Sequence, residues 1–316
     1  MPISIKGIPR HTVVVKVSVI IPTYCDTDKL ISCLEALARQ SACRADFEVI
    51  VVDNHDTPTI TQCDILIFPQ ARIIHQPTGG SYAARNLGIE KAQGDILLFT
   101  DADCLPAKSW ISRAIELQEQ GVVGGHVELV SKGDFSDLEL YERIFYFNQK
   151  AYIQEDRYAV TANLMVTKSI MNEVGLFDAS LRSGGDRIWG QLATSKGFSI
   201  SYDPKLKVLH PTRSQWRAFL KRRVRVLSGN LYLFHREVGL TWEHALTKMR
   251  FIGGMNNFKK WTGDWDFYDQ LSEEKKQKIR RLHRVFSLFD LLVILRCKLS
   301  FKTMKKLTLI DRNANG

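Results

Sequence analysis

The sequence predicts an α/β fold in which helices flank a mostly parallel sheet, followed by a basic, helical C-terminal extension. Short apolar runs, among them 47–52 and 96–99, alternate with stretches of helical periodicity, which is typical of parallel sheets. Each run ends abruptly in polar residues, as expected for a strand buried on both faces. Residues 1–203 contain 19 lysines and arginines against 25 acids, whereas residues 204–316 contain 25 against 9. We therefore expect an anionic partner to bind the last third.

The first half of the chain is expected to alternate strands and helices. The β-branched run 13–21 predicts the first strand, and leucines at helical spacing predict a helix capped by Asp26 or Thr27. Ser81 is expected to cap a second helix, which ends before Gly94. Shorter strands are expected at 65–68 and 73–74.

The second half is less regular. Gly124 and Gly125 lie inside the strand expected at 122–130 and predict a place where another group approaches the backbone closely. The other elements expected here are strands at 159–166, 198–202 and 207–210, and helices at 138–147, 168–174, 183–196 and 214–236.

A chain of 316 residues is long enough for one large domain with an appendage. Its six cysteines show neither Cys-x-x-Cys pairing nor zinc-ligand spacing. The first residues include Lys6, Arg10 and His11 but no long apolar stretch. We therefore expect no secretory leader, reduced thiols and a cytoplasmic location.

Two carboxylates, Asp101 and Asp103, directly follow the apolar run 96–99 and form an Asp-x-Asp (DXD) motif. In open α/β sheets, ligands bind just outside the carboxyl ends of the strands. Two acids so close together are costly unless a cation neutralises them, and Mg²⁺ or Mn²⁺ prefers carboxylate and phosphate oxygens. The pair therefore predicts a divalent metal that carries a phosphorylated substrate. The alternative is a polar turn that caps the following helix.

Seven short motifs follow one another between residues 17 and 186. They are Val-Ser-Val-Ile-Ile-Pro-Thr-Tyr (17–24), Val-Ile-Val-Val-Asp-Asn (49–54), Ala-Ala-Arg-Asn-Leu-Gly-Ile (83–89), Gly-Asp-Ile-Leu-Leu-Phe-Thr-Asp-Ala-Asp (94–103), Ala-Asn-Leu-Met-Val (162–166), Val-Gly-Leu-Phe-Asp (174–178) and Gly-Gly-Asp (184–186). In this order and spacing the chain resembles family 2 of the glycosyltransferases, which has the GT-A (Rossmann-like) fold. The resemblance covers roughly residues 15–230. It implies a GT-A domain at 1–236, with a nucleotide-binding half at about 13–106 and an acceptor half at 107–236, before the extension at 237–316.

The resemblance also implies an inverting transfer from a nucleoside-diphosphate sugar, with a UDP-sugar favoured, in the presence of Mn²⁺ or Mg²⁺. Asp103 would ligate the metal that bridges the diphosphate, and Asp101 would contact the ribose or a metal-bound water. His210 matches a position where some members supply a further metal ligand, although a single histidine is more often structural.

Five further residues are expected to bind the nucleotide-sugar. Pro22, Thr23 and Tyr24 would form a wall of the base site, where the Tyr24 ring could stack on the base. Asp53 could accept a hydrogen bond from a uracil N–H, or it could close the end of its strand as an Asx-turn. Arg85 could bind phosphate or hold a carboxylate in place, or it could make a surface salt bridge.

Asp186 is the expected general base, which takes the proton from the acceptor hydroxyl as that oxygen attacks the anomeric carbon. Family members usually carry Glu-Asp here, and Gly185 replaces the first acid. The alternative is an acid stabilised by the dipole of its helix. The candidates on the acceptor side are Asn163, Trp189, Arg213 and Trp216, of which Trp216 could equally belong to the core.

Two basic segments with interleaved apolar residues, 213–225 and 280–306, suit an anionic membrane surface or the phosphate of a lipid carrier. The apolar run 285–295 is broken by Asp290 and is shorter than the ~20 residues of a spanning helix. It predicts either a helix that lies on a membrane or a core helix packed on the main domain. No nucleic-acid module is recognisable in the sequence, so no nucleic acid is expected as a partner.

These observations predict a glycosyltransferase of the hexosyltransferase type that acts in polysaccharide or cell-envelope synthesis. It would glycosylate a lipid-linked or envelope glycan, peripherally at the inner face of the cell membrane. A sugar nucleotidyltransferase is a competing hypothesis, but it would need a Gly-rich loop with a basic residue after the first strand, and 22–26 offers none. The second competitor is a catalytically degenerate scaffold that binds nucleotide or glycan. The acid missing at Gly185 is its best support.

Overall fold

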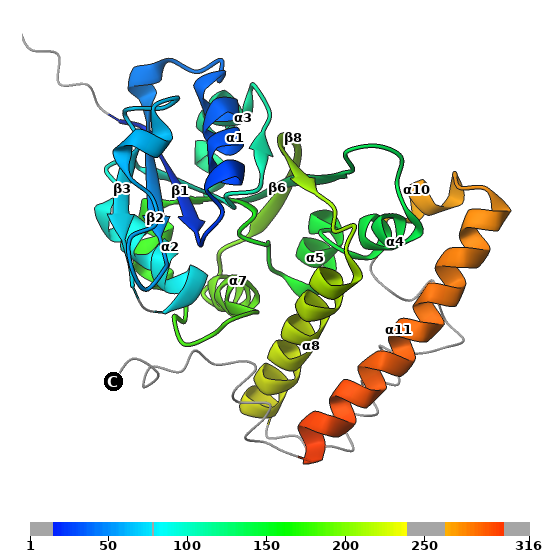
Figure 1. Cartoon of the computed structure of the whole chain (residues 1–316). Helices are drawn as coiled ribbons and strands as arrows, with labels where there is room; N and C mark the ends of the chain where they lie inside the picture. The colour runs from blue at the N-terminus through cyan, green and yellow to red at the C-terminus, as the bar shows by residue number, and fades with distance from the viewer. Residues whose placement is uncertain (1–14, 78, 239–262, 300–316) are drawn as a thin grey trace, which may run out of the picture.

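The computed structural model describes residues 15–77, 79–238 and 263–299. In this part of the chain, eight strands form one mixed sheet with the order β3-β2-β1-β4-β7-β6-β8-β5. Their bounds are β1 Val17–Thr23, β2 Phe47–Asp53, β3 Arg72–His75, β4 Ile96–Thr100, β5 Leu105–Pro106, β6 Val122–Val130, β7 Asn163–Thr167 and β8 Ile200–Pro211. The first four of the sheet order run parallel, β7 is antiparallel to both its neighbours, β8 is parallel to β6, and β5 is antiparallel to β8. The expected mostly parallel sheet with flanking helices is confirmed, although three of its strand pairs are antiparallel (Figure 1).

Helices cover both faces of this sheet and extend beyond one side of it (Figure 1). The α-helices are α1 Thr27–Ala38, α2 Gly80–Lys91, α3 Trp110–Glu116, α4 Asp137–Phe145, α5 Gln149–Asp156, α6 Lys168–Val174, α7 Gly185–Ser195, α8 Trp216–Val238, α10 Trp265–Asp269 and α11 Glu273–Leu299. Short 3-10 helices lie at Arg44–Asp46, Gln62–Ile65 and Gln118–Gln120. α1 and α3 pack on one face, and α2, α6 and α7 pack on the other.

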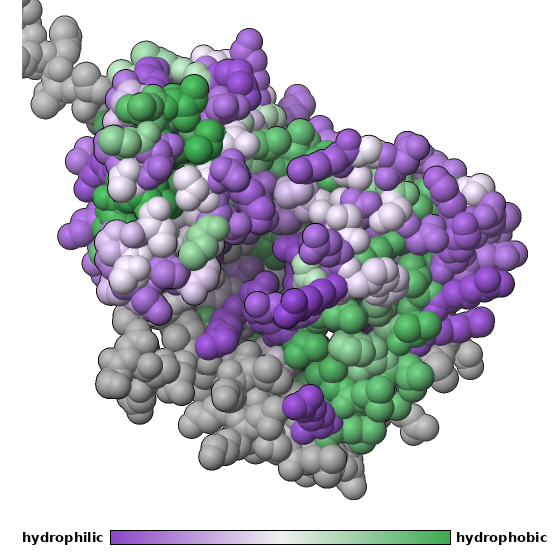
Figure 2. All heavy atoms as spheres, in the orientation of Figure 1, coloured by the Kyte–Doolittle hydropathy of each residue, from purple (hydrophilic) through white to green (hydrophobic). Residues whose placement is uncertain are grey.

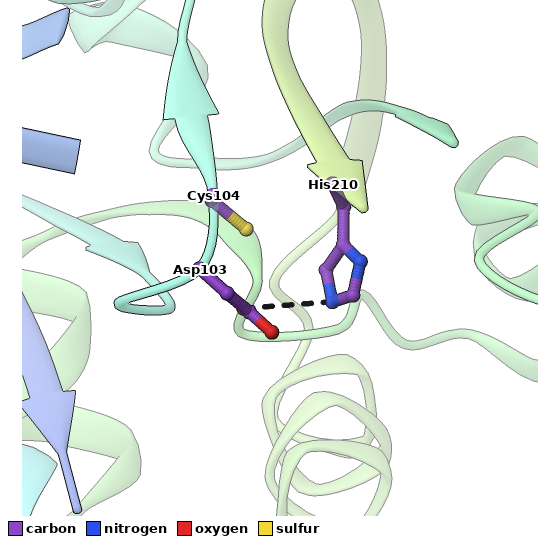
Figure 3. Close-up of side chains that lie close together, drawn as sticks. All are labelled: Asp103, Cys104 and His210. Atoms are coloured by element: carbon purple, nitrogen blue, oxygen red, sulfur yellow. Dashed lines mark ion pairs between the residues drawn. The ribbon is translucent and has the colours of Figure 1, made fainter. Parts of the chain in front are cut away.

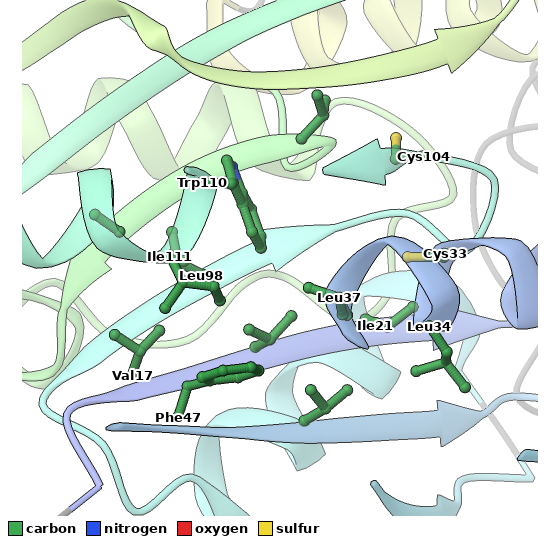
Figure 4. Packing of buried hydrophobic residues seen from close by; sticks show 14 of the residues in the cluster. Val17, Ile21, Cys33, Leu34, Leu37, Phe47, Leu98, Cys104, Trp110 and Ile111 are labelled. Carbon is green, nitrogen blue, oxygen red and sulfur yellow. The ribbon is translucent and has the colours of Figure 1, made fainter. Parts of the chain in front are cut away.

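The sheet forms because apolar side chains of its strands alternate between the two faces. Val17 and Ile21 of β1 pack with Leu34 of α1 and belong to the same cluster as Trp110 of α3 (Figure 4). Ile20 points to the other face and packs in the cluster that contains α2 and α7. All residues of β1 and β4 are buried, so the loops at their carboxyl ends stand on a rigid base.

A second, smaller core lies between α4, α8, α10 and α11. Its aromatic centre contains Tyr141, Phe219 and Phe286, with the Phe286 ring centroid 4.8 Å from Tyr141 and 4.9 Å from Phe219. The Arg223 guanidinium donates two hydrogen bonds of 2.6 Å to the carboxylate of Asp290 and so joins α8 to α11. The acid that interrupts the apolar run is therefore a structural partner. None of the helices in the described ranges combines the length and the apolar character needed to cross a membrane.

Three expected strands take other forms. The run 65–68 is not a strand, because Thr61 and Asp64 form a capping box that starts a 3-10 helix, with the Thr61 hydroxyl 2.7 Å from Asp64. The two strands expected at 198–202 and 207–210 are one strand, β8, interrupted by an irregularity. There the Asp203 carboxylate accepts hydrogen bonds from two backbone N–H groups within the next three residues.

Two predicted helix caps also differ. α1 begins where expected, but the Asp26 side chain makes no capping hydrogen bond and instead contacts Lys29 at 2.8 Å. Ser81 lies inside α2, and Gly79 takes the N-cap position with a φ of 100°, which favours glycine. The start of the run 13–21 and most of the extension expected at 237–316 lie outside the described residues, so the domain boundaries stay predictions.

Candidate active site

A cleft of about 1210 Å³ opens at the carboxyl ends of β1 and β4 and continues toward α8 and α11. Figure 2 shows the hollow near the centre of the view, with hydrophilic side chains along it. The predicted site residues that line it are Pro22, Thr23, Tyr24, Arg85, Asp101, Asp103, Asp186, His210 and Arg213. Asp53, Asn163, Trp189 and Trp216 are not among its lining residues. The fold thus brings Asp103 and Asp186 into one cleft from distant parts of the chain.

Asp103 and His210 point toward one another from the turn before β5 and the end of β8 (Figure 3). The His210 Nε2 atom lies 3.6 Å from Oδ1 of Asp103. The His210 Nδ1 atom lies 2.8 Å from the carbonyl oxygen of Pro211, which can only accept, so Nδ1 carries the proton of this hydrogen bond. In the neutral ring, Nε2 then presents its lone pair toward Asp103. A carboxylate oxygen and an imidazole nitrogen in this arrangement suit Mn²⁺.

Cys104 lies beside this pair, and sequence reasoning did not single it out. Potential ligand atoms of Asp103, Cys104 and His210 all lie within 4.8 Å of one another. The thiol is buried, 3.9 Å from the carbonyl oxygen of Ala162, and burial raises the pKa of Cys104 well above its usual value, with Asp101 and Asp103 adding to the rise. A thiol binds metals as the thiolate, so Cys104 would join Asp103 and His210 as a ligand only if the bound ion displaces its proton.

Arg85 holds Asp101 in place. Its guanidinium is buried and pairs through Nη2 with Oδ1 of Asp101. The Nη1 group donates to the carbonyl oxygen of Ser81 at 3.3 Å, and Nε has no hydrogen-bond partner among the described residues. The pair is therefore a buried contact at the cleft wall, and the surface salt bridge considered as the alternative for Arg85 does not apply.

Asp186 lies in the first turn of α7 and is held by three donors, one of which is the backbone of Thr161. Its Oδ1 atom accepts a hydrogen bond of 3.1 Å from the Tyr82 hydroxyl and one of 3.0 Å from the backbone N–H of Arg187. Burial raises the pKa of the Asp186 carboxyl above its usual value, while the Arg85 cation opposes the rise. A raised pKa brings a carboxylate closer to the range in which it works as a base.

Tyr82 was missed by sequence reasoning, because its contact with the Gly185–Asp186 segment depends on the fold. A Cβ atom at Gly185 would lie 2.8 Å from the Tyr82 ring. The ring therefore occupies the space in which the glutamate usual in the family would begin. In this chain the Tyr82 ring packs against Gly185, and its hydroxyl donates to the neighbouring Asp186.

The expected base site is only partly as predicted. Tyr24 is 56% exposed at the cleft, and the buried Thr23 hydroxyl has no hydrogen-bond partner among the described residues. Asp53 lies behind the cleft wall, and its Oδ2 atom accepts from the backbone N–H of Thr59 at 2.6 Å and from its hydroxyl at 3.0 Å. Its carboxylate thus closes the turn, as in the alternative considered for it. The neighbouring Asn54 lines the cleft instead.

Two acceptor-side candidates lie in the core. The Trp189 indole of α7 is buried in the core on the face of the sheet that α2, α6 and α7 cover, and it donates to the carbonyl oxygen of Gly175 at 2.8 Å. The Asn163 amide is buried and donates to the carbonyl oxygen of Leu206 at 2.8 Å, while a Cβ at Gly125 would lie 2.3 Å from its nitrogen. Both side chains point into the core, so the acceptor contacts predicted from their residue types are wrong. The close approach expected at Gly125 is confirmed.

Of the other two acceptor-side candidates, one lines the cleft and one does not. Trp216 is 49% exposed at the start of α8, with its ring 5.7 Å from that of Phe286, and it lies outside the cleft. Arg213 lines the cleft, and its Nη1 atom lies 2.7 Å from Oε1 of the buried Glu142. Of these four residues, only Arg213 is placed to reach a bound acceptor.

Solved structures share the fold and define its class. The mannosyltransferase PcManGT from Pyrobaculum calidifontis, in complex with GDP-Man and Mn²⁺, matches with a TM-score of 0.59 at 17% identity, covering 91% of this chain and 88% of that one. S. aureus TarS matches with a TM-score of 0.50 at 20% identity, covering 83% of this chain and 47% of that one. The fold is therefore of the GT-A type, as expected.

Sequence comparison then gives the family. The family model described as "Glycosyl transferase family 2" matches residues 18–175. Glycosyltransferase AglE of Haloferax volcanii is 35% identical over 225 residues, which cover 69% of this chain and 74% of AglE. An uncharacterized glycosyltransferase of Rickettsia felis is 28% identical over 186 residues, 57% of this chain but only 30% of that protein. The chain belongs to glycosyl transferase family 2 and is a glycosyltransferase, an enzyme of the EC 2.4 class.

Proposed function

We propose that the enzyme transfers a sugar from a nucleoside-diphosphate sugar to a hydroxyl of a lipid-linked or cell-envelope glycan, with inversion at the anomeric carbon. A UDP-sugar is the favoured donor. The observation that carries the proposal is the single cleft in which Asp103 and His210 line one part and Asp186 another. PcManGT, which shares the fold, is described in complex with GDP-Man and Mn²⁺, and a divalent metal is the element of that description that we extend to this chain.

Asp103 and His210 would hold Mn²⁺ or Mg²⁺, since their oxygen and nitrogen atoms fit such an ion. When bound, the ion supplies positive charge that stabilises the departing diphosphate. Asp101, held by Arg85, keeps a carboxylate oxygen for a ribose hydroxyl or a water. Arg85 adds a buried positive charge to this part of the cleft, which favours a phosphorylated ligand.

Asp186 would remove the proton from the acceptor hydroxyl. The Tyr82 hydroxyl, the Arg187 N–H and the backbone of Thr161 hold this carboxylate at the cleft, where it would accept that proton. The acceptor oxygen attacks the anomeric carbon from the face opposite the diphosphate, and this inverts the configuration. Pro22 and Tyr24 would wall the base, and Asn54 would contact it in place of the Asp53 carboxylate, which is occupied by the turn.

Peripheral contact with an anionic membrane at its cytoplasmic face is the second part of the proposal. One side of α11 exposes a stripe of large apolar residues, namely Val285, Leu288, Leu291, Leu292 and Leu295. Exposed arginines flank it, at positions 281, 284 and 296. A helix with this composition suits the interface of an anionic leaflet. Sedimentation with anionic vesicles tests this part: Leu292→Gln should lower binding, and unchanged sedimentation would count against it.

The main proposal is tested by Mn²⁺-dependent release of UDP from UDP-sugars. We expect the wild type to release UDP with Mn²⁺ and Asp186→Asn to be slower by about 10²–10⁴-fold, the usual contribution of a general base. Asp156→Asn is the matched control, because this acid lines the same cleft and is 38% exposed beside Arg187. A scaffold would release no UDP in any of these proteins, and an Asp186→Asn enzyme as fast as the wild type would remove the assigned base.

A further inference from the structure

The cleft continues beyond the candidate active site into a groove between α8 and α11. Apolar side chains line this end: Leu227 and Leu231 from α8, and Leu288, Leu291 and Ile294 from α11. Leu288 is 59% exposed and Leu291 is 42% exposed. Figure 2 shows hydrophobic side chains gathered over the C-terminal half of α11. An apolar groove that is open to water and continuous with a polar site is suited to a ligand with one polar and one apolar end.

Two arginines lie where the polar part of the cleft approaches this groove. Arg213 and Arg222 share one carboxylate, since their Nη1 atoms lie 2.7 Å and 3.6 Å from Oε1 of Glu142. The other oxygen of Glu142 accepts the backbone N–H of Arg213 at 2.6 Å. Two guanidinium groups against one carboxylate leave a positive charge that is not neutralised within this cluster. Val226, one turn after Arg222 on α8, also lines the cleft, so Arg222 lies next to the start of the apolar groove.

The surroundings of Arg222 keep this charge available for a ligand. Its guanidinium lies over the rings of Tyr146 and Phe147, at 4.3 Å and 4.8 Å from their centroids. Its Nη1 atom is buried and has no hydrogen-bond partner among the described residues. Burial lowers the pKa of Arg222, with the neighbouring Arg213 cation adding to the effect. A guanidinium fixed in this way binds an oxyanion at a small cost in side-chain ordering.

Phe147 lies between this cluster and the candidate metal ligands. Its ring also packs on that of His210, with centroids 4.5 Å apart, and so the ring contacts both the metal ligand and Arg222. The arginine cluster is thus next to the donor site but is continuous with the apolar groove. This arrangement favours an anion that belongs to the acceptor.

We infer that Arg213 and Arg222 bind the phosphate of a lipid-linked acceptor, and that the groove between α8 and α11 holds the first part of its hydrocarbon chain. The inference rests on the proposed function in taking the acceptor glycan to be carried by a lipid phosphate. With the phosphate at this cluster, the glycan extends along the cleft toward Asp186. The chain leaves past Leu288 and Leu291, which also belong to the exposed stripe of α11.

Isothermal titration of the full chain with geranyl phosphate, without metal or donor, tests this inference. Geranyl phosphate should bind about tenfold or more tightly than either inorganic phosphate or geraniol, because it alone fills both parts of the site. Arg222→Gln should weaken it by roughly tenfold or more, as expected for the loss of a charged hydrogen bond. Leu288→Gln should weaken it by about threefold to tenfold.

Two control variants change residues that lie outside the cleft, and the first of them matches Leu288 in exposure. Leu292 is 58% exposed on the same helix as Leu288 but does not line the cleft, so Leu292→Gln should bind geranyl phosphate like the wild type. Arg217 is exposed on α8 outside the cleft, and Arg217→Gln should also be unchanged. Because Leu288 and Leu292 are equally exposed, any difference between their variants reports the groove and not the fold.

Equal affinity for geranyl phosphate in the wild type, Arg222→Gln and Leu288→Gln would overturn the inference. It would also be overturned if Arg222→Gln weakened UDP binding in Mn²⁺ but left geranyl phosphate binding unchanged, since the cation would then serve the donor. Titration of the wild type with UDP and Mn²⁺ tests the proposed function separately. Binding of geranyl phosphate without binding of UDP would remove the proposed donor and leave the lipid-phosphate site standing.

Discussion

The rim of the sheet and the α8–α11 pair hold their charged residues in opposite ways. Asp101 and Asp103 follow a fully buried strand, yet their own side chains are 34% and 23% exposed. The Arg223 side chain is only 7% exposed and that of Asp290 only 16%, and their ion pair joins the two helices. A substitution at the rim can therefore change the chemistry of the site without disturbing the strands, whereas a substitution in the helical pair alters the packing of the helices.

The largest expected effect at the rim is on catalysis. Asp103→Ala should lower Mn²⁺-dependent transfer by about 10²–10³-fold or more, the scale for loss of a group that stabilises developing charge. Its melting temperature should hardly change, because substitutions at partly exposed positions usually alter stability by about 0.5 kcal/mol or less. Asp26→Ala is a suitable control, since this acid lines the same cleft without capping α1. Turnover of Asp103→Ala at the wild-type rate would remove the metal role.

The largest effect in the helical pair is on stability. Asp290→Ala leaves the Arg223 guanidinium buried without its counter-charge, which costs about 3–5 kcal/mol. Urea unfolding measures this cost. Glu274→Ala on the same helix removes only an exposed ion pair with Lys278, and it should cost about 1 kcal/mol or less. A loss for Asp290→Ala as small as that control would show that the pair does not join the helices.

Tyr82→Phe should have an intermediate effect that appears in the pH profile. The hydrogen bond from Tyr82 stabilises the ionised form of Asp186, so its removal should raise the pKa of this carboxyl. Burial already raises that pKa, while the Arg85 cation lowers it. The acid limb of kcat/KM should therefore move to higher pH, with a loss of about tenfold below neutral pH. Tyr24→Phe keeps its ring and should leave the profile unchanged. A Tyr82→Phe profile identical to the wild type would contradict the positioning role.

The smallest expected effect is that of Trp216→Ala. Half of this side chain is exposed and its ring packs on Phe286, so its removal should cost about 1–2 kcal/mol of unfolding free energy. Transfer by the folded variant should be unchanged, since the residue lies outside the cleft. A selective rise in the KM for the acceptor would instead restore the predicted acceptor role.

Much of the rim could be predicted because it depends on local sequence. The buried runs that form β1 and β4 end in polar residues, and chain direction alone then places Asp101, Asp103 and the loop after residue 21 at one edge of the sheet. The helix that begins at Gly185 could also be predicted, from Gly184 and Gly185 and from Asp186, which follows them. Strand order places all of these around one cleft.

The remaining features depend on partners that are distant in the sequence. Tyr82 meets Asp186 across more than a hundred residues, and neither segment contains a pattern for that contact. Asp53 and Trp189 have the residue types expected of ligand contacts, but hydrogen bonds with the backbone of Thr59 and Gly175, which residue type does not reveal, occupy them. Asp290 interrupts an apolar run, and only the packing of α8 on α11 reveals its partner. Residue type indicates possible chemistry, and tertiary packing decides which group remains free to perform it.

The central claim is that the carboxylates at the sheet rim bind a donor diphosphate through a divalent ion. Thermal unfolding of the wild type and Asp103→Ala, each with UDP and with or without Mn²⁺, tests it most directly. UDP at about 100 times its Kd should stabilise the wild type by about 2.7 kcal/mol, only when Mn²⁺ is present, and should not stabilise Asp103→Ala. An equal stabilisation by UDP without Mn²⁺, or in Asp103→Ala, would contradict the claim.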